Sequence, residues 1–170
     1  MTGERRPAAV VVMGVSAVGK STVGLELARR LGSAFVDADD LHPAANVEKM
    51  RAGAPLDDAD RLPWLRVVGE ALAAGDAGRV IACSALRRRY RDVIREACPD
   101  ARFVELVVPT GELAGRLGSR PGHFMPASLL TSQLEALEPI EADEAGARVE
   151  NVGTVDEVVS RAIAAIGQGW

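Results

Sequence analysis

One stretch of the sequence carries the residue types of a phosphate-binding loop. It fits the pattern G-x-x-x-x-G-K-S and reads Gly14-Val15-Ser16-Ala17-Val18-Gly19-Lys20-Ser21. In such a loop the glycines let backbone N–H groups curl around an anion, and the N-terminus of the following helix adds a positive dipole. We expect Lys20 to reach the β- and γ-phosphates of ATP and Ser21 to bind Mg²⁺, with Thr22 completing the nucleotide site. The alternative is a glycine-rich turn with an incidental lysine, but only two of the 20 basic residues are lysines.

A second polar cluster follows a short apolar run further along the chain. Asp37 and Asp39 are separated by one residue, so in an extended segment both carboxylates point the same way. Two carboxylates beside a phosphate loop suit the coordination of Mg²⁺-bound water and the acceptance of a hydroxyl proton. The alternative is an acidic turn in which Asp40 caps a helix, and His42, which precedes a proline, has an equally good structural explanation.

These two patterns favour a kinase of small molecules over other phosphate-loop proteins. A GTP-binding switch would carry an N-K-x-D guanine motif, which the sequence lacks, and its D-x-x-G signature occurs only at 143–146, out of order. With 170 residues the chain is also too short for an ATP-driven motor with its accessory elements. A nucleotide-binding sensor without catalytic activity remains as an alternative from another class.

The composition indicates one globular domain in the cytoplasm. The 24 acidic and 20 basic residues give a net charge of −4, which argues against a nucleic-acid-binding protein. No stretch approaches the roughly 18 apolar residues of a membrane span, and the two cysteines form no C-x-x-C pair. We expect residues 1–7 to be a flexible leader and 8–170 to be a single domain.

The elements that would position these motifs alternate between strands and helices. The first strand, 8–13, is a continuous apolar run, as in a strand buried on both faces of a parallel sheet. Further strands are predicted at 34–37, 79–83, 103–108 and 147–151, with helices between them. We expect Ser84 to cap a helix that reaches Ala97. The alternation predicts a parallel sheet of five strands with helices on both faces.

In combination, the motifs resemble those of the gluconate kinases, which are relatives of shikimate kinase with the P-loop NTPase fold. Besides the phosphate loop, the shared landmarks are Asp37, Asp39, Leu41 and His42; Asp60, Arg61, Pro63, Trp64 and Leu65; Cys83, Ser84, Ala85 and Leu86; Tyr90, Arg91 and Asp92; Arg116, Arg120, Gly122, His123 and Phe124; and Gln133, Glu135 and Leu137. The resemblance implies ATP-dependent phosphorylation of D-gluconate to 6-phospho-D-gluconate, with Mg²⁺ as a cofactor, and a homodimer. It also implies a mobile lid around 116–137, where 120–126 has two prolines and no helical period.

The same resemblance implies roles for individual residues. Asp39 is expected to act on the reacting hydroxyl and Asp37 on Mg²⁺-bound water. Arg116 and Arg120 are expected to contact the nucleotide from the lid, with Arg120 as the catalytic arginine. The carboxylate and the hydroxyls of the substrate would be bound by Arg61, Arg87, His123, His42 and Gln133. For Arg61 the alternative is an ion pair with the aspartates that precede it.

Two positions depart from the pattern of this family. Ala17 stands where the loop usually has glycine, and if that position needs a positive φ, alanine costs on the order of 1 kcal/mol. Arg87 stands where lysine is usual, and its planar fork binds anions differently from a point charge. A kinase of another small polyol or sugar acid, such as shikimate, therefore remains as the second reading.

Overall fold

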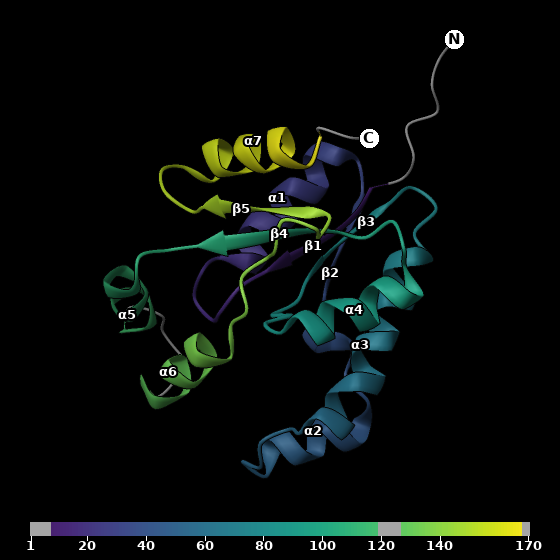
Figure 1. Ribbon diagram of the computed structural model, residues 1–170, viewed down its shortest axis with the longest axis vertical. Coiled ribbons are helices and arrows are strands. Elements are labelled where there is room, and N and C mark those ends of the chain that lie inside the picture. The colour runs from purple at the N-terminus through teal and green to yellow at the C-terminus, as the bar shows by residue number, and fades with distance from the viewer. Residues whose placement is uncertain (1–7, 119–126, 168–170) are drawn as a thin grey trace.

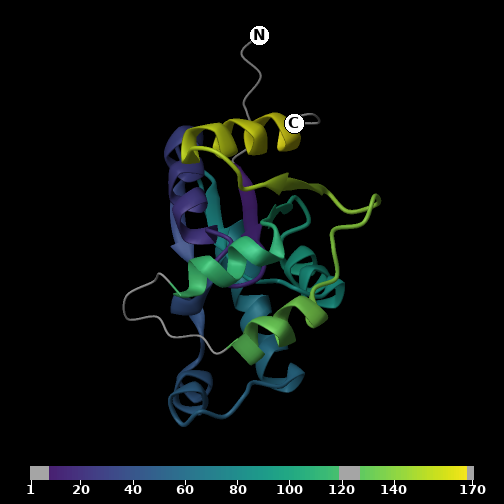
Figure 2. The same cartoon turned by 90° about the vertical axis from the view of Figure 1, so that its left-hand side faces the viewer.

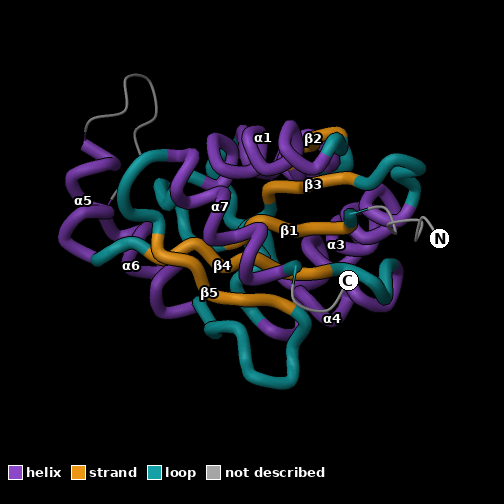
Figure 3. Tube along the Cα trace, turned by 90° about the horizontal axis from the view of Figure 1, so that it is seen from above, coloured by secondary structure: helices purple, strands orange, loops and turns teal. Residues whose placement is uncertain are grey.

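The fold is an open sheet of five parallel strands. A computed structural model describes residues 8–118 and 127–167. The strands are β1 (Ala9–Met13), β2 (Ala34–Asp37), β3 (Arg79–Ala82), β4 (Arg102–Val107) and β5 (Gly146–Glu150). Their spatial order is β2-β3-β1-β4-β5, and every neighbouring pair is parallel (Figure 3). The predicted five-stranded parallel sheet is confirmed.

Helices cover both faces of this sheet, as predicted (Figure 1). They are α1 (Lys20–Leu31), the 3-10 helix η1 (Ala38–Leu41), α2 (Ala44–Arg51), α3 (Asp58–Ala73), α4 (Arg88–Ala97), α5 (Thr110–Gly118), α6 (Ala127–Ala136) and α7 (Val155–Ile166). Helices α1 and α7 pack on one face, and α3 and α4 pack on the other. Figures 1 and 2 show α2 at the opposite end of the molecule from α7.

Strand β1 lies at the centre of the sheet because its side chains supply both halves of the core. Val10 and Val12 belong to the cluster that includes α1 and α7, whereas Val11 and Met13 belong to the cluster that includes α3 and α4. All five residues of the strand are buried. A continuous apolar run satisfies both faces, and this is the pattern that identified the strand in the sequence.

Because all five strands are parallel, their carboxyl ends lie at one edge of the sheet. In open α/β sheets this edge is where ligands bind. The phosphate loop follows β1, Asp37 ends β2, Ser84 follows β3, and Asn151 follows β5. The fold therefore gathers segments that are distant in sequence into one candidate site. No helix within 8–118 and 127–167 combines the length and the apolar character needed to cross a bilayer.

The predicted start of the helix after β3 is wrong. Helix α4 begins at Arg88, and Ser84 lies in an irregular segment, 84–87. Ala85 has φ 42°, which no helical residue adopts, and the Ser84 carbonyl accepts a hydrogen bond from the Gly14 N–H (3.3 Å). The backbone at this point is held by the phosphate loop instead of continuing into a helix.

Candidate active site

The phosphate loop connects β1 to α1 and contains three residues with positive φ. Gly14 has φ 142° and Gly19 has φ 94°. A Cβ on Gly19 would lie 2.6 Å from the Asn151 Nδ2 atom, so the position requires glycine on steric grounds as well. Ala17 has φ 68°, which confirms that the alanine at this position is strained, at a cost of about 1 kcal/mol.

Lys20, the first residue of α1, folds back over this loop. Its Nζ atom donates to the carbonyls of Gly14 and Val15, both at 3.0 Å. The backbone of the loop thereby holds the ammonium group beside the amide groups that would bind phosphate. This arrangement suits neutralisation of a phosphoryl group during transfer.

Ser21 and Asp37 come together as the sequence predicted. The Ser21 hydroxyl donates to Asp37 Oδ2 over 3.3 Å. Hydroxyl and carboxylate oxygens are ligands that Mg²⁺ accepts, usually together with waters and substrate phosphates. Within 8–118 and 127–167, no group of three or more His, Cys, Asp and Glu side chains could hold a metal ion alone. The Ser21 and Asp37 oxygens together fit a Mg²⁺ ion that is shared with the phosphates of a nucleotide.

Asp39 does not lie in an extended segment with Asp37, contrary to the prediction. It belongs to η1, and its N–H donates to Asp37 Oδ1 (3.0 Å). The residue that caps this helix is therefore Asp37, whereas the alternative interpretation of the sequence gave that role to Asp40. Desolvation and the neighbouring charge of Asp37 raise the pKa of Asp39, and His42 and Lys20 act in the opposite direction. Asp39 is exposed to solvent, so its carboxyl group is accessible from the edge of the sheet.

His42 is fixed by its aromatic and amide neighbours. Its ring stacks on Trp64 with centroids 4.0 Å apart, and Trp64 in turn donates its indole N–H to the Ala38 carbonyl (2.8 Å). The Asn46 Nδ2 atom lies 3.3 Å from His42 Nδ1, and if the amide donates, the imidazole proton is on Nε2. Burial lowers the pKa of His42, opposed by Asp39. A neutral ring of this kind suits hydrogen bonding to hydroxyl groups.

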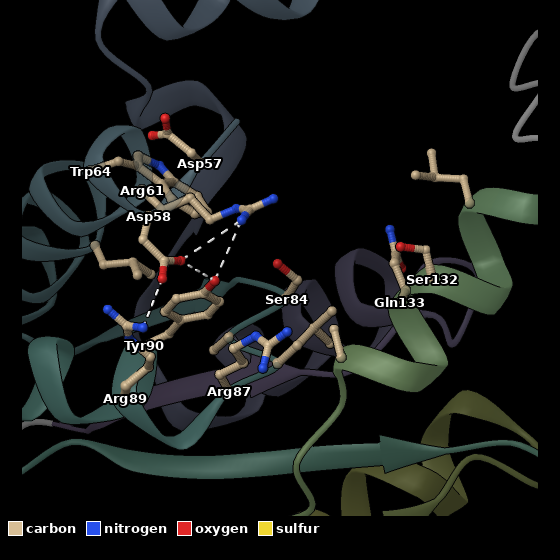
Figure 4. A pocket seen from close by; sticks show the side chains of 15 residues that line it. Asp57, Asp58, Arg61, Trp64, Ser84, Arg87, Arg89, Tyr90, Ser132 and Gln133 are labelled. Carbon is tan, nitrogen blue, oxygen red and sulfur yellow. Dashed lines mark hydrogen bonds and ion pairs between the residues drawn. The ribbon is translucent and has the colours of Figure 1, made fainter. Parts of the chain in front are cut away.

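A cavity of about 670 Å³ lies between the start of α3, the segment 84–90 and α6 (Figure 4). Its lining residues are Asp57, Asp58, Arg61, Trp64, Leu65, Ser84, Ala85, Leu86, Arg87, Arg89, Tyr90, Leu129, Ser132, Gln133 and Ala136. Asp39 and His42 are not among them, although Trp64 lines the cavity and stacks on His42. The cavity therefore lies next to η1, and it adjoins the phosphate loop through Ser84, whose carbonyl accepts from the Gly14 N–H.

Arg61 and Arg87, two candidates for binding a carboxylate, both line this cavity. Arg61 Nη1 lies 3.4 Å from the Tyr90 hydroxyl and 4.0 Å from Asp58 Oδ1 (Figure 4). Arg87 Nη1 lies 3.9 Å from Glu138 Oε1. The ion pair considered for Arg61 thus exists with Asp58, at a long distance. Both guanidinium groups keep donors for a bound anion.

Gln133 contacts both the cavity and the phosphate loop. It lines the cavity from α6, but its Oε1 atom accepts a hydrogen bond from the Ser16 N–H over 2.7 Å. These two residues are 117 positions apart in the sequence. Gln133 therefore connects the cavity to the phosphate loop.

Arg116 approaches the phosphate loop through Asn151, a residue that the sequence analysis missed. Arg116 donates to the Asn151 carbonyl (3.3 Å) and to Glu112 (3.1 Å), and the Asn151 side chain donates to the Val18 carbonyl (2.5 Å). The signal for Asn151 was its place directly after a strand at the ligand-binding edge. Tyr90 and Asp58, which share a 2.6 Å hydrogen bond at the cavity, had no predicted role either.

The remaining two candidates, Arg120 and His123, lie outside the described residues, as does the leader 1–7. The expected lid, 116–137, therefore has its two described ends in α5 and α6.

A phosphate loop at the edge of a parallel sheet, next to a polar cavity with arginines, defines the class of P-loop kinases of small molecules. The family described as AAA domain matches residues 10–140. The gluconokinase of Gluconobacter oxydans (strain 621H) is 50% identical over 93% of this chain and 90% of its own length. The crystal structure of a gluconokinase from Sinorhizobium meliloti 1021 is 44% identical, with a TM-score of 0.86, over 97% of this chain and 94% of its own. The chain belongs to the gluconokinase family.

The likeness to shikimate kinase goes no further than the fold. The enzyme from Aquifex aeolicus vf5 has a TM-score of 0.59 over 91% of this chain and 93% of its own, but only 17% of the residues are identical.

Proposed function

We propose that this chain transfers the γ-phosphoryl group of ATP to the 6-hydroxyl of D-gluconate, which gives 6-phospho-D-gluconate and ADP. The observation that carries this proposal is a cavity with Arg61 and Arg87 on its wall, adjoining the phosphate loop, in a chain of the gluconokinase family. The same geometry supplies a place for each reactant.

The phosphate loop would bind the triphosphate through its backbone N–H groups, while Lys20 neutralises charge on the group that is transferred. Ser21 and Asp37 would hold Mg²⁺, which supplies further charge neutralisation on the phosphates. Arg116, which lies at the phosphate loop, and Arg120 are proposed to stabilise the phosphates from the side of the lid.

Asp39 is the proposed acceptor of the proton from the reacting hydroxyl. As the new O–P bond forms at the sugar acid, the bond between the β–γ bridging oxygen and the γ-phosphorus breaks, and ADP leaves with the electron pair. The hydroxyl proton passes to the Asp39 carboxylate, whose raised pKa makes it a better base than a fully solvated aspartate. Asp39 lies close enough to Lys20 for their charges to interact.

The carboxylate of gluconate is proposed to bind Arg61 and Arg87, with His123 as a third candidate. A charged, bidentate contact in a confined site is stronger than a neutral hydrogen bond, and it rejects uncharged analogues. His42 and Gln133 are proposed to hydrogen-bond the hydroxyls.

A coupled ADP-release assay over gluconate, glucose, glucitol and shikimate tests this function. We expect kcat/KM for gluconate to exceed that for glucitol by about 10² or more, because glucitol lacks the charged partner of the two guanidinium groups. Comparable values for the two would contradict recognition of the carboxylate. ATP binding without ADP release in the presence of any acceptor would favour a nucleotide-binding sensor.

Arginine variants in the same assay show which of the two substrates, gluconate or ATP, each arginine binds. Arg61→Ala and Arg87→Ala should each raise the KM for gluconate far more than the KM for ATP. A rise confined to ATP would place these arginines in the nucleotide site.

We further propose that the protein is a homodimer in the cytoplasm, on the strength of its likeness to gluconate kinases and its composition. Analytical ultracentrifugation and cell fractionation test these two points.

A further inference from the structure

Behind the wall of the cavity lies a buried ion pair that the proposed reaction does not use. The side chains of Arg91 and Glu144 are both 0% exposed and form two parallel hydrogen bonds, of 2.7 and 2.9 Å. Burial pushes the pKa of Glu144 up, but hydrogen bonds from Arg91, Arg95 and the Glu141 N–H hold it at about 2. Burying such a pair usually adds little stability, because the desolvation of both charges offsets their attraction. Its position therefore calls for another explanation.

Arg91 uses its remaining donors to hold one wall of the cavity. Its Nη1 atom donates to the carbonyls of Ala85 (3.1 Å) and Leu86 (3.4 Å). Ala85 has φ 42°, a strained conformation that persists only where its surroundings fix it. Ser84 and Arg87, on either side, line the cavity. The side chain of Arg91 thus lies where it can keep this backbone in its strained form.

The same pair is attached to the opposite wall. Arg91 Nη2 donates to the Pro139 carbonyl (3.4 Å), and Glu144 accepts from the Glu141 N–H (2.8 Å). The Glu138 N–H donates to the Leu86 carbonyl (2.7 Å), which joins the two segments directly. Residues 138–144 follow α6, the helix that carries Gln133. The pair therefore connects the segment 84–87 to the end of α6.

We propose that Arg91 and Glu144 are positioning residues that fix the segment 84–87 relative to α6 and thereby set the shape of the acceptor cavity. Neither side chain contacts the substrate in this scheme. Their effect on the reaction is exerted chiefly through the position of Arg87 on the cavity wall, and it rests on the function proposed above.

The test replaces the pair by apolar residues of similar size, in the double variant Arg91→Met/Glu144→Leu. Exchanging both fully buried partners avoids the unpaired buried charge that removing one of them would leave. Arg95, which also bonds Glu144, is partly exposed and keeps its pair with Asp92. We expect the KM for gluconate to rise about tenfold, since release of a strained backbone position has effects of that order. The KM for ATP should stay within about twofold, because the phosphate loop keeps its own contacts.

The matched control is Arg88→Met on the same helix. Arg88 pairs with Glu141 and Asp143 of the same connecting segment, but these pairs are exposed to solvent. Exposed pairs contribute little, so both KM values should remain those of the wild type.

A second substitution addresses the strain itself. Ala85→Gly, added to the double variant, should recover about threefold or more of the lost gluconate affinity, because glycine adopts a positive φ without strain. Amide hydrogen exchange should be faster at 84–88 and 138–144 in the double variant than in the wild type, and this readout needs no substrate. If the double variant loses its fold, the same kinetics and hydrogen exchange are measured on Glu144→Gln. We expect the gluconate KM of this variant to rise less than tenfold.

A gluconate KM within twofold of the wild type in the folded variant would overturn the proposal, as would equal rises in both KM values. Unchanged exchange at the two segments would overturn it as well. Failure of the proposed function would instead appear in the wild type, as absence of gluconate-dependent ADP release, while the exchange experiment would still decide the role of the pair.

Discussion

At the scale of single residues, the phosphate loop depends on one ammonium group that the backbone holds in place. Lys20→Ala should lower kcat by about 10²–10³, a range typical for removal of one donor that stabilises developing charge. Melting temperature should change little, since Lys20 is only half-buried and its bonds to the Gly14 and Val15 carbonyls contribute modestly to stability. The measurement is steady-state kinetics together with thermal melting.

The matched control is Lys49→Ala, which removes the other lysine of the chain. Lys49 pairs with Asp60 (2.6 Å) away from the phosphate loop, and its loss should leave kcat within about twofold. Near wild-type turnover in Lys20→Ala would show that the loop is not the catalytic phosphate site.

Asp39 combines a role in the reaction with a cost in stability. Desolvation and Asp37 raise its pKa in the folded protein above the unfolded value of about 3.9. The folded state therefore binds the proton more tightly, and this group makes the protein less stable as pH rises through that raised pKa. The deficit grows between the unfolded pKa and the raised folded pKa and is constant above the latter. Asp39→Asn should lower kcat strongly, and its melting temperature relative to the wild type should improve from about pH 4 to neutral pH.

Melting curves and kcat over this pH range measure both effects. An unchanged kcat in Asp39→Asn would show that the acidic cluster is a structural turn without a role in the reaction. A melting temperature that falls relative to the wild type as pH rises would contradict the assigned direction of the pKa shift.

At the scale of secondary-structure elements, α6 carries a side chain that contacts the phosphate loop from outside. Gln133→Ala removes the acceptor of the Ser16 N–H, a contact worth about 1 kcal/mol, or roughly fivefold in affinity. Because Gln133 also lines the cavity, the KM values for ATP and gluconate should both rise. Steady-state kinetics with each substrate varied in turn measures this coupling.

Glu135→Ala, at an exposed position of the same helix, provides the control. It should leave both KM values unchanged. A rise in Gln133→Ala that is limited to gluconate would mean that the contact with Ser16 has no part in nucleotide binding.

At the scale of the whole molecule, one core on each face of the sheet supports the loops at its edge. Leu27 of α1 is 0% exposed, and Leu27→Ala should lower the free energy of unfolding by about 2–5 kcal/mol. Leu25, two positions away, is 59% exposed, and Leu25→Ala should change it by less than about 0.5 kcal/mol. Urea unfolding curves measure the difference.

Both variants should keep a kcat near that of the wild type at temperatures well below melting. The leucine substitutions leave the loop itself intact, and α1 retains its other buried contacts. If Leu27→Ala and Leu25→Ala lowered the free energy of unfolding equally, Leu27 would not be a core residue.

The sequence by itself determined the parts of this protein that depend on local pattern. The apolar run of β1 and the glycine-lysine spacing after it are readable because a strand buried on both faces and an anion-binding turn each demand their residues at adjacent positions. The Ser21 and Asp37 pair followed because parallel strands end at one edge of the sheet.

Only the tertiary structure decided which of several similar side chains is buried and which faces the cavity. Arg87, Arg88, Arg89 and Arg91 are alike in the sequence, yet only Arg91 is fully buried, whereas Arg87 lines the cavity. The irregular segment after β3 and the contact between Gln133 and Ser16 could not be predicted either, because their partners lie far away in the sequence. Such contacts arise from packing between elements, which overrides local preference, and no spacing rule within one segment encodes them.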